Sequence, residues 1–263
     1  WQLPPIVSSS DPIDRRDNEL LSVIPRNRRE MYEIGQIISA VVDRDSFFEI
    51  SPAYGQSLTV GLARMDGHAV GLMANNTKHH GGAVNASASE KMMRFVDLCD
   101  TFHLPMINLV DNPGFLIGTE AEQEGTVRLG SRALMAVYQS SIPWVSVIIR
   151  RCYGVAGAGH GKSDGLNLRY AWPSADWGSL PIEGGVQAAY RRDIESAEDP
   201  ELRRRELEDM LEQYRSPLRT AEAFGIEEVI DPRDTRPLLC EWVKLAYELL
   251  PSQLGPKART SRP

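Results

Sequence analysis

The sequence predicts an α/β fold, in which a sheet of buried strands is layered between helices. Two segments, 105–111 (PMINLVD) and 143–151 (PWVSVIIRR), are almost continuous apolar runs. Such runs are typical of strands that are buried on both faces, as the strands of a parallel sheet are. Segments with apolar residues at helical spacing lie before and after them, which favours strands alternating with helices around one layered core.

The elements before these two strands each carry a local signal. Residues 31–43 have apolar residues at helical spacing and predict a helix. Residues 58–76 alternate in polarity on both sides of an Asp-Gly dipeptide, which predicts two strands joined by a tight hairpin turn. Residues 87–102 begin with Ser and have Glu three residues later, the spacing of a capping box, and continue as an amphipathic helix.

The later part of the chain is predominantly helical by pattern. Periodic apolar and charged residues predict four further helices, at 122–141, 181–192, 199–216 and 237–250. The final segment, 251–263, is rich in proline, polar and basic residues and is expected to be a disordered tail.

Composition argues against several classes of function. The net charge of −7 and the isoelectric point of about 5.4 argue against a nucleic-acid binder and against binding to an anionic membrane. No apolar run approaches the roughly 20 residues of a transmembrane helix. The three cysteines lack CxxC spacing, so they predict neither a zinc site nor a disulfide framework and fit a reducing cytoplasm. His79 and His80 lack partners at metal-ligand spacing, and no metal is expected.

Two successive strand-to-helix junctions are rich in glycine, at 111–120 (DNPGFLIGTE) and 152–161 (CYGVAGAGHG). A glycine-rich turn between a buried strand and a helix exposes backbone N–H groups, which suits a phosphate or a developing oxyanion. The second junction lacks the GxGxxG spacing of a dinucleotide site, and Ala156 stands where a P-loop needs glycine. Small residues also allow close helix packing, but two such junctions in succession favour an oxyanion site.

The residues from 111 to 159 resemble the carboxyltransferase (beta) subunit of biotin-dependent acyl-CoA carboxylases of the acetyl- and propionyl-CoA type. The family pattern is DxPGFxxGxxxExxGxxRxGAxxxxA, followed by an apolar strand and R[KR]xYGGAY. Further family motifs match residues 87–105, 170–192 and 221–239. The resemblance implies a crotonase-like (ClpP/crotonase) ββα-spiral fold. It also implies a division of the chain into a connector from a missing N-terminal half (1–30), a single C-terminal carboxyltransferase domain (31–250) and the tail.

The resemblance also implies a chemistry that fits backbone donors. In this family CO₂ passes from carboxybiotin to the α-carbon of an acyl-CoA, in fatty acid metabolism. The substrates supply the base, so the protein has to stabilise transient oxyanions through peptide N–H groups. By alignment on Tyr153 and Gly154, the donors to the biotin oxyanion are the amides of Val155 and Ala156.

Residue 155 departs from the family, which has glycine there, but its backbone N–H is retained. Gly157 stands in place of the usual Tyr, and Ala158 at a position that influences acyl size. His160 also departs from the family pattern and is expected to lie in a surface loop. The resemblance assigns contacts with biotin to Tyr153, Gly154, Gly157, Ala158, Pro113, Gly114 and Phe115.

The implied partners are a homologous N-terminal carboxyltransferase half or subunit, biotin carboxylase and a biotin carboxyl carrier protein that carries the biotin. The expected assembly is a homo- or hetero-oligomer built from dimers, such as a hexamer, in the cytoplasm. Two alternatives remain open. A biotin-dependent acyl-CoA decarboxylase or transcarboxylase would share this half-site. A non-catalytic assembly subunit would keep the fold without the chemistry, and Val155 and Gly157 favour that alternative.

Overall fold

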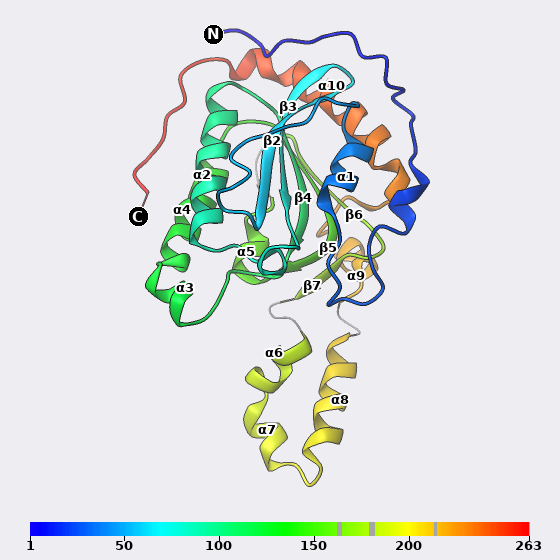
Figure 1. The fold of residues 1–263 in the computed structure, drawn as a ribbon, viewed down its shortest axis with the longest axis vertical. Coiled ribbons are helices and arrows are strands. Elements are labelled where there is room, and N and C mark those ends of the chain that lie inside the picture. The colour runs from blue at the N-terminus through cyan, green and yellow to red at the C-terminus, as the bar shows by residue number, and fades with distance from the viewer. Residues whose placement is uncertain (162–164, 179–181, 213–214, 263) are drawn as a thin grey trace.

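The computed structural model describes residues 1–161, 165–178, 182–212 and 215–262. A sheet lies between helices, and a helical arm extends from one end of this body (Figure 1). Within the described residues, none of the helices is both long and apolar enough to cross a membrane.

The sheet has the strand order β1-β2-β3-β4-β5-β6-β8, and β7 pairs with the last residues of β5. The pairs β1–β2 and β2–β3 are antiparallel, and the later pairs are parallel. Every residue of β4 is buried, as its continuous apolar run predicts. The described strands are β1 (Phe48–Glu49), β2 (Leu58–Met65), β3 (His68–Asn75), β4 (Met106–Asn112), β5 (Trp144–Tyr153), β6 (Asn167–Ala171), β7 (Asp176–Gly178) and β8 (Glu228–Val229).

Helices cover both faces of the sheet, which confirms the layered α/β architecture (Figure 1). On one face the core is built with α1 and α10, and on the other with α2 and α4. Adjacent residues of β4 divide between the two cores, because Met106 packs toward α2 and α4 and Ile107 toward α1 and α10. The described helices are α1 (Ile34–Val41), α2 (Ala86–Thr101), α3 (Thr119–Gln123), α4 (Thr126–Gln139), α5 (Gly154–Ala158), α6 (Ile182–Ala189), α7 (Arg191–Ser196), α8 (Pro200–Glu212), α9 (Pro217–Glu222) and α10 (Thr235–Gln253), and short 3₁₀ turns lie at Asn18–Leu21, His80–Gly82 and Pro232–Asp234.

Turn and cap residues explain where the predicted elements begin and end. The hairpin between β2 and β3 is confirmed, with Asp66 and Gly67 at positive φ (49° and 76°), as a two-residue turn requires. The predicted capping box at the start of α2 is wrong. The helix begins one residue earlier than the pattern indicates, and the side chain of Asn85 accepts the Ala88 N–H at 2.9 Å in place of Ser87.

In two places the sequence predicts a single helix where the structure has two shorter helices. Gly125, at φ 72°, separates α3 from α4, because its left-handed backbone cannot continue an α-helix. Tyr190, at φ −111° and ψ 22°, separates α6 from α7. In both places the apolar periodicity continues across the break, so the pattern does not reveal it.

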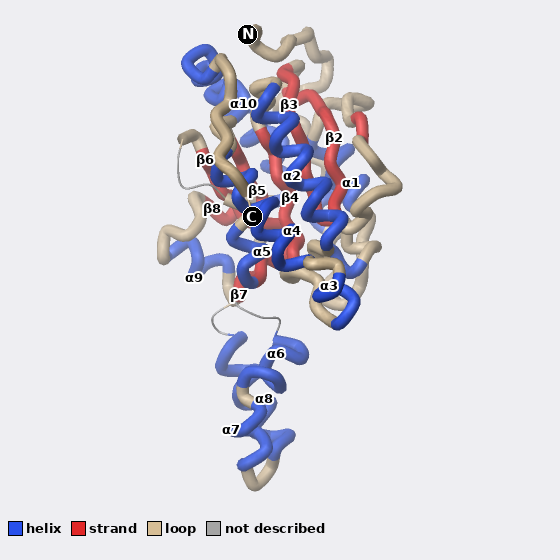
Figure 2. The backbone as a smooth tube through the Cα atoms, turned by 90° about the vertical axis from the view of Figure 1, so that its left-hand side faces the viewer, coloured by secondary structure: helices blue, strands red, loops and turns tan. Residues whose placement is uncertain are grey.

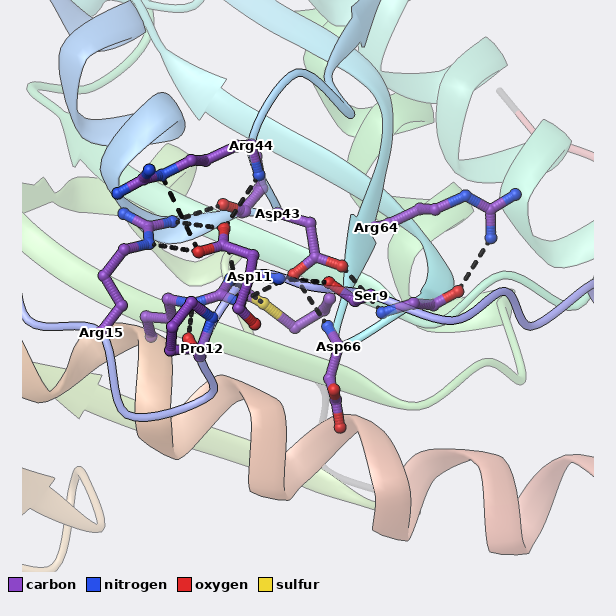
Figure 3. Close-up of polar contacts among 12 residues, drawn as sticks. Ser9, Asp11, Pro12, Arg15, Asp43, Arg44, Arg64 and Asp66 are labelled. Carbon is purple, nitrogen blue, oxygen red and sulfur yellow. Dashed lines mark hydrogen bonds and ion pairs between the residues drawn. The ribbon is translucent and has the colours of Figure 1, made fainter.

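A buried charged group fastens the N-terminal segment to the body. We call Asp11, Arg15, Asp43 and Arg236 the strap cluster (Figure 3). The Nη2 of Arg236 lies 2.8 Å from Oδ1 of Asp43, and its Nε donates to the carbonyl of Pro12 at 2.9 Å. Arg15 pairs with Asp11 at 2.8 Å. Residues of the predicted connector therefore bond with both the start of the sheet and α10.

The C-terminal segment, for which the composition predicts disorder, begins as a continuation of the last helix. Helix α10 continues through Pro251 to Gln253, and the described residues that follow run along the body next to α2 and α4. Two guanidinium nitrogens of Arg262 pair with the carboxylate of Asp97, each at 2.8 Å. Arg259 adds a pair with Asp97 at 3.3 Å. These ion pairs give the segment a defined path.

The arm consists of α6, α7 and α8 and stands clear of the sheet in both views (Figures 1 and 2). Its own small core contains Ile182, Val186, Ile194 and Leu207. The charged sequence of α8 forms ion pairs along its surface, such as those of Arg204 with acidic residues one turn before and after it. The arm thus has only a thin apolar centre.

Candidate functional site

The two glycine-rich junctions lie side by side at the carboxyl ends of β4 and β5. These strands are parallel neighbours, and their last registered pair joins Asn112 to Cys152. The register shifts between Val110 and Asn112, an irregularity of the kind that is common beside active sites. The ends of adjacent parallel strands are also where ligands bind in open α/β sheets.

Asp111 fixes the base of both junctions. One carboxylate oxygen accepts from Nε of Arg151 at 2.6 Å, and the other from Nε of Arg150 at 2.9 Å and from the Tyr32 hydroxyl at 2.9 Å. Burial, with Asp111 beside it, raises the pKa of Tyr32 well above its usual value. The Arg151 side chain also donates to the carbonyl of Gly81. The carboxylate is thus paired on both oxygens while it is fully buried.

The proposed oxyanion donors lie in the first turn of α5, directly after β5. Gly154 has φ 60°, a conformation that favours glycine and turns the chain from strand to helix. The side chain of Val155 is 67% exposed and that of Ala156 is buried. The N–H groups in the first turn of a helix have no carbonyl partner inside the helix. The geometry therefore leaves the Val155 side chain facing outward and donors beside it.

The Pro113-Gly114-Phe115 turn is held in place from three sides. The Gly114 N–H donates to Oδ1 of Asn112 at 2.9 Å, and the Gly114 carbonyl accepts from Val84 at 3.0 Å. The Phe115 ring packs against α4, where a Cβ added at Gly130 would come within 2.4 Å of the ring. Phe115 is therefore mainly part of the packing between this turn and α4.

Tyr153 is buried in a polar group at the end of β5. Its hydroxyl donates to Asp176 at 2.5 Å and accepts from Arg215 at 2.8 Å. Burial, together with Asp176, raises the pKa of Tyr153. With Pro113, Tyr153 borders a cavity of about 250 Å³ on the side of Arg150 and Arg151.

A larger cavity, of about 800 Å³, opens on the other side of α5. The position of Gly157 is tight for a side chain, because a Cβ there would lie 3.0 Å from the Cys152 carbonyl carbon. Burial raises the pKa of Cys152 to about 12, so its thiol stays protonated. The side chain of Ala158 lies outside the described residues. The cavity is lined by Ile148, Cys152, Gly154, Val155, Gly157, His160, Gly161, Arg169, Trp177 and Gly178.

His160 is not in a surface loop, as the sequence predicts, but is buried, with 2% of its surface exposed. Its ring nitrogens Nδ1 and Nε2 lie 2.8 Å from Nδ2 of Asn108 and 2.7 Å from Nδ2 of Asn112. We call Asn108, Asn112 and His160 the imidazole cluster. Burial lowers the pKa of His160 to about 4, so the ring is neutral near pH 7.

His79 and His80 lie on the other side of the junctions, in the turn that contains Gly81. His80 has φ 50°, and Gly81 accepts the bond from Arg151. Among the residues that the structure describes, no group of three or more His, Cys, Asp or Glu side chains could hold a metal ion.

Sequence reasoning missed two parts of the site, the ion pairs of Asp111 and the imidazole cluster. For the ion pairs, the sequence did contain a signal: Asp111 follows one apolar strand directly, and Arg150 and Arg151 end the next one. The second carries no comparable signal, because Asn108 lies inside an apolar run and His160 follows a run of small residues.

Comparisons with known proteins place the chain among carboxyltransferases. It is 37% identical over 235 residues to the carboxyltransferase subunit of propionyl-CoA carboxylase from Haloferax mediterranei. This alignment covers 89% of this chain and 46% of that protein. It is 33% identical over 234 residues to methylmalonyl-CoA decarboxylase subunit alpha from Veillonella parvula, with 89% of this chain and 45% of that protein. The chain therefore spans about half the length of the curated relatives it matches.

Among solved structures, the chain is similar to transcarboxylase 12S, a hexamer with methylmalonyl-coenzyme A bound in that crystal. The TM-score is 0.87 at 29% identity, over all of this chain and 49% of the other. This likeness confirms the predicted crotonase-like α/β fold. The model of the carboxyl transferase domain matches residues 2–257, almost the whole sequence, and the chain therefore belongs to the carboxyl transferase domain family.

Proposed function

We propose that this chain is the biotin-side half of an acyl-CoA carboxylase carboxyltransferase. In that role it helps to transfer CO₂ from carboxybiotin to the α-carbon of an acyl-CoA. The observation that carries the proposal is the meeting of the two glycine-rich turns at the ends of β4 and β5, in a chain of this family.

The residues present fit a bound biotin. When bound, carboxybiotin supplies the CO₂ and then the base that removes the α-proton of the acyl-CoA. The chain's own contribution is the pair of backbone N–H groups at Val155 and Ala156, which would stabilise the developing oxyanion. Four further residues are proposed to contact biotin. Gly154 and Gly157 line the larger cavity, and Tyr153 and Pro113 line the smaller one. The turn of Gly114 and Phe115 joins the proposed site beside Pro113, and Ala158 stays part of the proposal from the family alignment.

A side-chain base is not needed in this proposal. Both ring nitrogens of His160 are within hydrogen-bond distance of an asparagine amide, and its pKa of about 4 makes it a poor proton acceptor at neutral pH. The protonated thiol of Cys152 is no better suited to the role.

The partners in the proposal follow from membership of the carboxyl transferase domain family. They are a homologous N-terminal carboxyltransferase half, biotin carboxylase and a carrier protein that presents the biotin, in an oligomer built from dimers. We place this assembly in the cytoplasm, which the free cysteines Cys99, Cys152 and Cys240 support.

A transcarboxylase or decarboxylase is the second candidate. It is favoured by the TM-score of 0.87 to transcarboxylase 12S and by the decarboxylase relative. The half-site would be the same, and the reactions differ in the source and fate of the CO₂. ATP and bicarbonate dependence of acyl-CoA carboxylation in the assembled complex separates the carboxylase from both.

The matched variants Ala156→Pro and Ala156→Gly test whether the backbone N–H of residue 156 stabilises the oxyanion. Proline removes the N–H in the first turn of α5, where its ring is tolerated, and glycine keeps the N–H. We expect Ala156→Pro to lower kcat by roughly 10²-fold, as the loss of one oxyanion donor does, and Ala156→Gly to stay close to wild type.

Both variants are assayed in complex with the N-terminal half, after circular dichroism and size exclusion have shown that they fold and assemble. Near-normal turnover in the proline variant would show that the backbone donor is not at residue 156. An absence of turnover in the wild-type complex, with intact carboxylation of biotin, would favour a non-catalytic assembly subunit.

A further inference from the structure

His160 connects three parts of the site that are distant in the sequence. Its side chain lies between Asn108 and Asn112 of β4. Its carbonyl accepts the hydroxyl of Ser146 from β5, and its own N–H donates to the Gly157 carbonyl of α5 at 3.2 Å. One residue thus fastens the end of the second glycine-rich turn to both strands.

The hydrogen bonds assign the tautomer of the ring. The Gly114 N–H needs the Oδ1 of Asn112 as its acceptor, so the Nδ2 of Asn112 faces His160. Nε2 of the ring therefore accepts this bond and carries no proton. A neutral imidazole then carries its proton on Nδ1, which faces Asn108.

The amide of Asn108 has to present oxygen to this proton. As placed, its nitrogen faces Nδ1 of His160 and its buried Oδ1 has no hydrogen-bond partner. Amide orientation is assigned from the hydrogen-bond network. Turning the amide by 180° gives up the 3.4 Å hydrogen bond from Nδ2 to the Ser146 hydroxyl, but it places Oδ1 opposite the Nδ1 proton and removes a contact between two donors. The result is a directed chain from Gly114 through Asn112 and His160 to Asn108.

We propose that His160 is a positioning residue that holds the Gly114 turn and the 154–160 turn in one fixed arrangement for the bound biotin. The inference rests on the proposed function for its ligand. The contacts themselves are present in this chain. The imidazole of His160 is hydrogen-bonded to Asn112, whose side-chain oxygen accepts the Gly114 N–H. His160 also lines the larger cavity, together with Val155. Because both ring nitrogens are occupied, His160 acts through its neighbours and not on the substrate.

The matched variants His160→Gln and His160→Leu separate hydrogen bonding from packing. Glutamine offers one donor and one acceptor, as the neutral ring does, and leucine keeps an apolar volume without either. In His160→Leu we expect the peptide containing Gly114 to exchange its amide hydrogens about tenfold faster, the equivalent of one lost hydrogen bond, and in His160→Gln we expect much less change. Hydrogen–deuterium exchange with mass spectrometry measures this in the full chain.

The kinetic counterpart uses the complex with the N-terminal half, with free biotin as the acceptor of CO₂ from a carboxylated acyl-CoA. His160→Leu should raise the KM for biotin about tenfold and leave the KM for the acyl-CoA unchanged, with rescue in His160→Gln. Nitrogen-15 NMR of the ring should show the proton on Nδ1. If His160→Leu fails to fold, Asn108→Ala removes the other partner of the ring, leaves the acceptor of the Gly114 N–H in place, and should also speed exchange at Gly114.

Three results overturn the proposal: a proton on Nε2, unchanged exchange at Gly114 in His160→Leu, or equal changes of both KM values in that variant. An inactive wild-type complex would instead contradict the proposed function. The exchange and NMR results would still decide whether His160 holds the Gly114 turn.

Discussion

The molecule has two buried polar groups that are built on opposite electrostatic principles. The strap cluster is charged, and it fastens the N-terminal segment to α10 (Figure 3). The imidazole cluster is neutral, and it joins the turns of the proposed site. Asp43 and Arg236 of the strap cluster and all three residues of the imidazole cluster are buried, so their polar atoms have to be satisfied internally. The comparison indicates that this fold uses paired charges to anchor a segment and neutral hydrogen bonds to shape the site.

The two clusters respond to burial in opposite ways. Burial alone would raise the pKa of Asp43, but the Gly67 amide and Arg236 outweigh it and lower the pKa. His160 has no charged partner of this kind, and burial alone lowers its pKa to about 4. The charged group therefore remains ionised inside the protein, whereas the imidazole gives up its charge.

The largest effect should come from removing the cation of the strap cluster. Arg236→Met leaves the buried carboxylate of Asp43 without its cation, whereas Asp11 keeps Arg15, and we expect a loss of about 3–5 kcal/mol in the free energy of unfolding. Urea unfolding measures it. The control is Arg233→Met, three residues earlier, whose pair with Asp231 is partly exposed and should contribute far less to the free energy of unfolding. Equal losses in the two variants would remove the distinction between the clusters.

The imidazole cluster should appear in the pH dependence of stability. The unfolded chain protonates His160 below pH 6.5, and the folded chain only near pH 4. Between these values the unfolded state binds the extra proton, so stability falls as the pH falls, by up to about 1.4 kcal/mol per pH unit. The difference between wild type and His160→Gln isolates this slope, because the other titrating groups are common to both. A flat difference from pH 6.5 to 4 would show that the ring titrates normally.

The strap cluster should lose its contribution in a lower pH window. Since the pKa of Asp43 lies below 3.8 in the folded protein, its stabilisation is present above pH 3.8 and is lost as the pH falls through the folded value. The two windows therefore do not overlap. The free energies of unfolding of wild type and Asp43→Asn should differ by a constant amount between pH 6.5 and 4 and converge only below that range, as urea unfolding at each pH would show.

The sequence predicted the layers and the location of the site but not its internal support. Apolar runs and helical spacing reflect burial, and burial is what places β4 and β5 at the centre. The resemblance to a family is what assigns the proposed donors to Val155 and Ala156, and this assignment stays a prediction. The burial of His160 was missed because it depends on Asn108 and Asn112, which lie about 50 residues away and meet it only when β4 pairs with β5. The same holds for Arg236, whose partners belong to another end of the chain.

The strap cluster also sets an order of events when the chain is made. Arg236 follows Asp43 by 193 residues, so a ribosome adding 5–20 residues per second exposes the aspartates about 10–40 s before their cation. During that interval strands β2 to β5 are already available for pairing, whereas the group that fastens residues 11–15 is incomplete. Residues 11–15 are thus synthesised before most of the sheet but complete their docking only when α10 has been made.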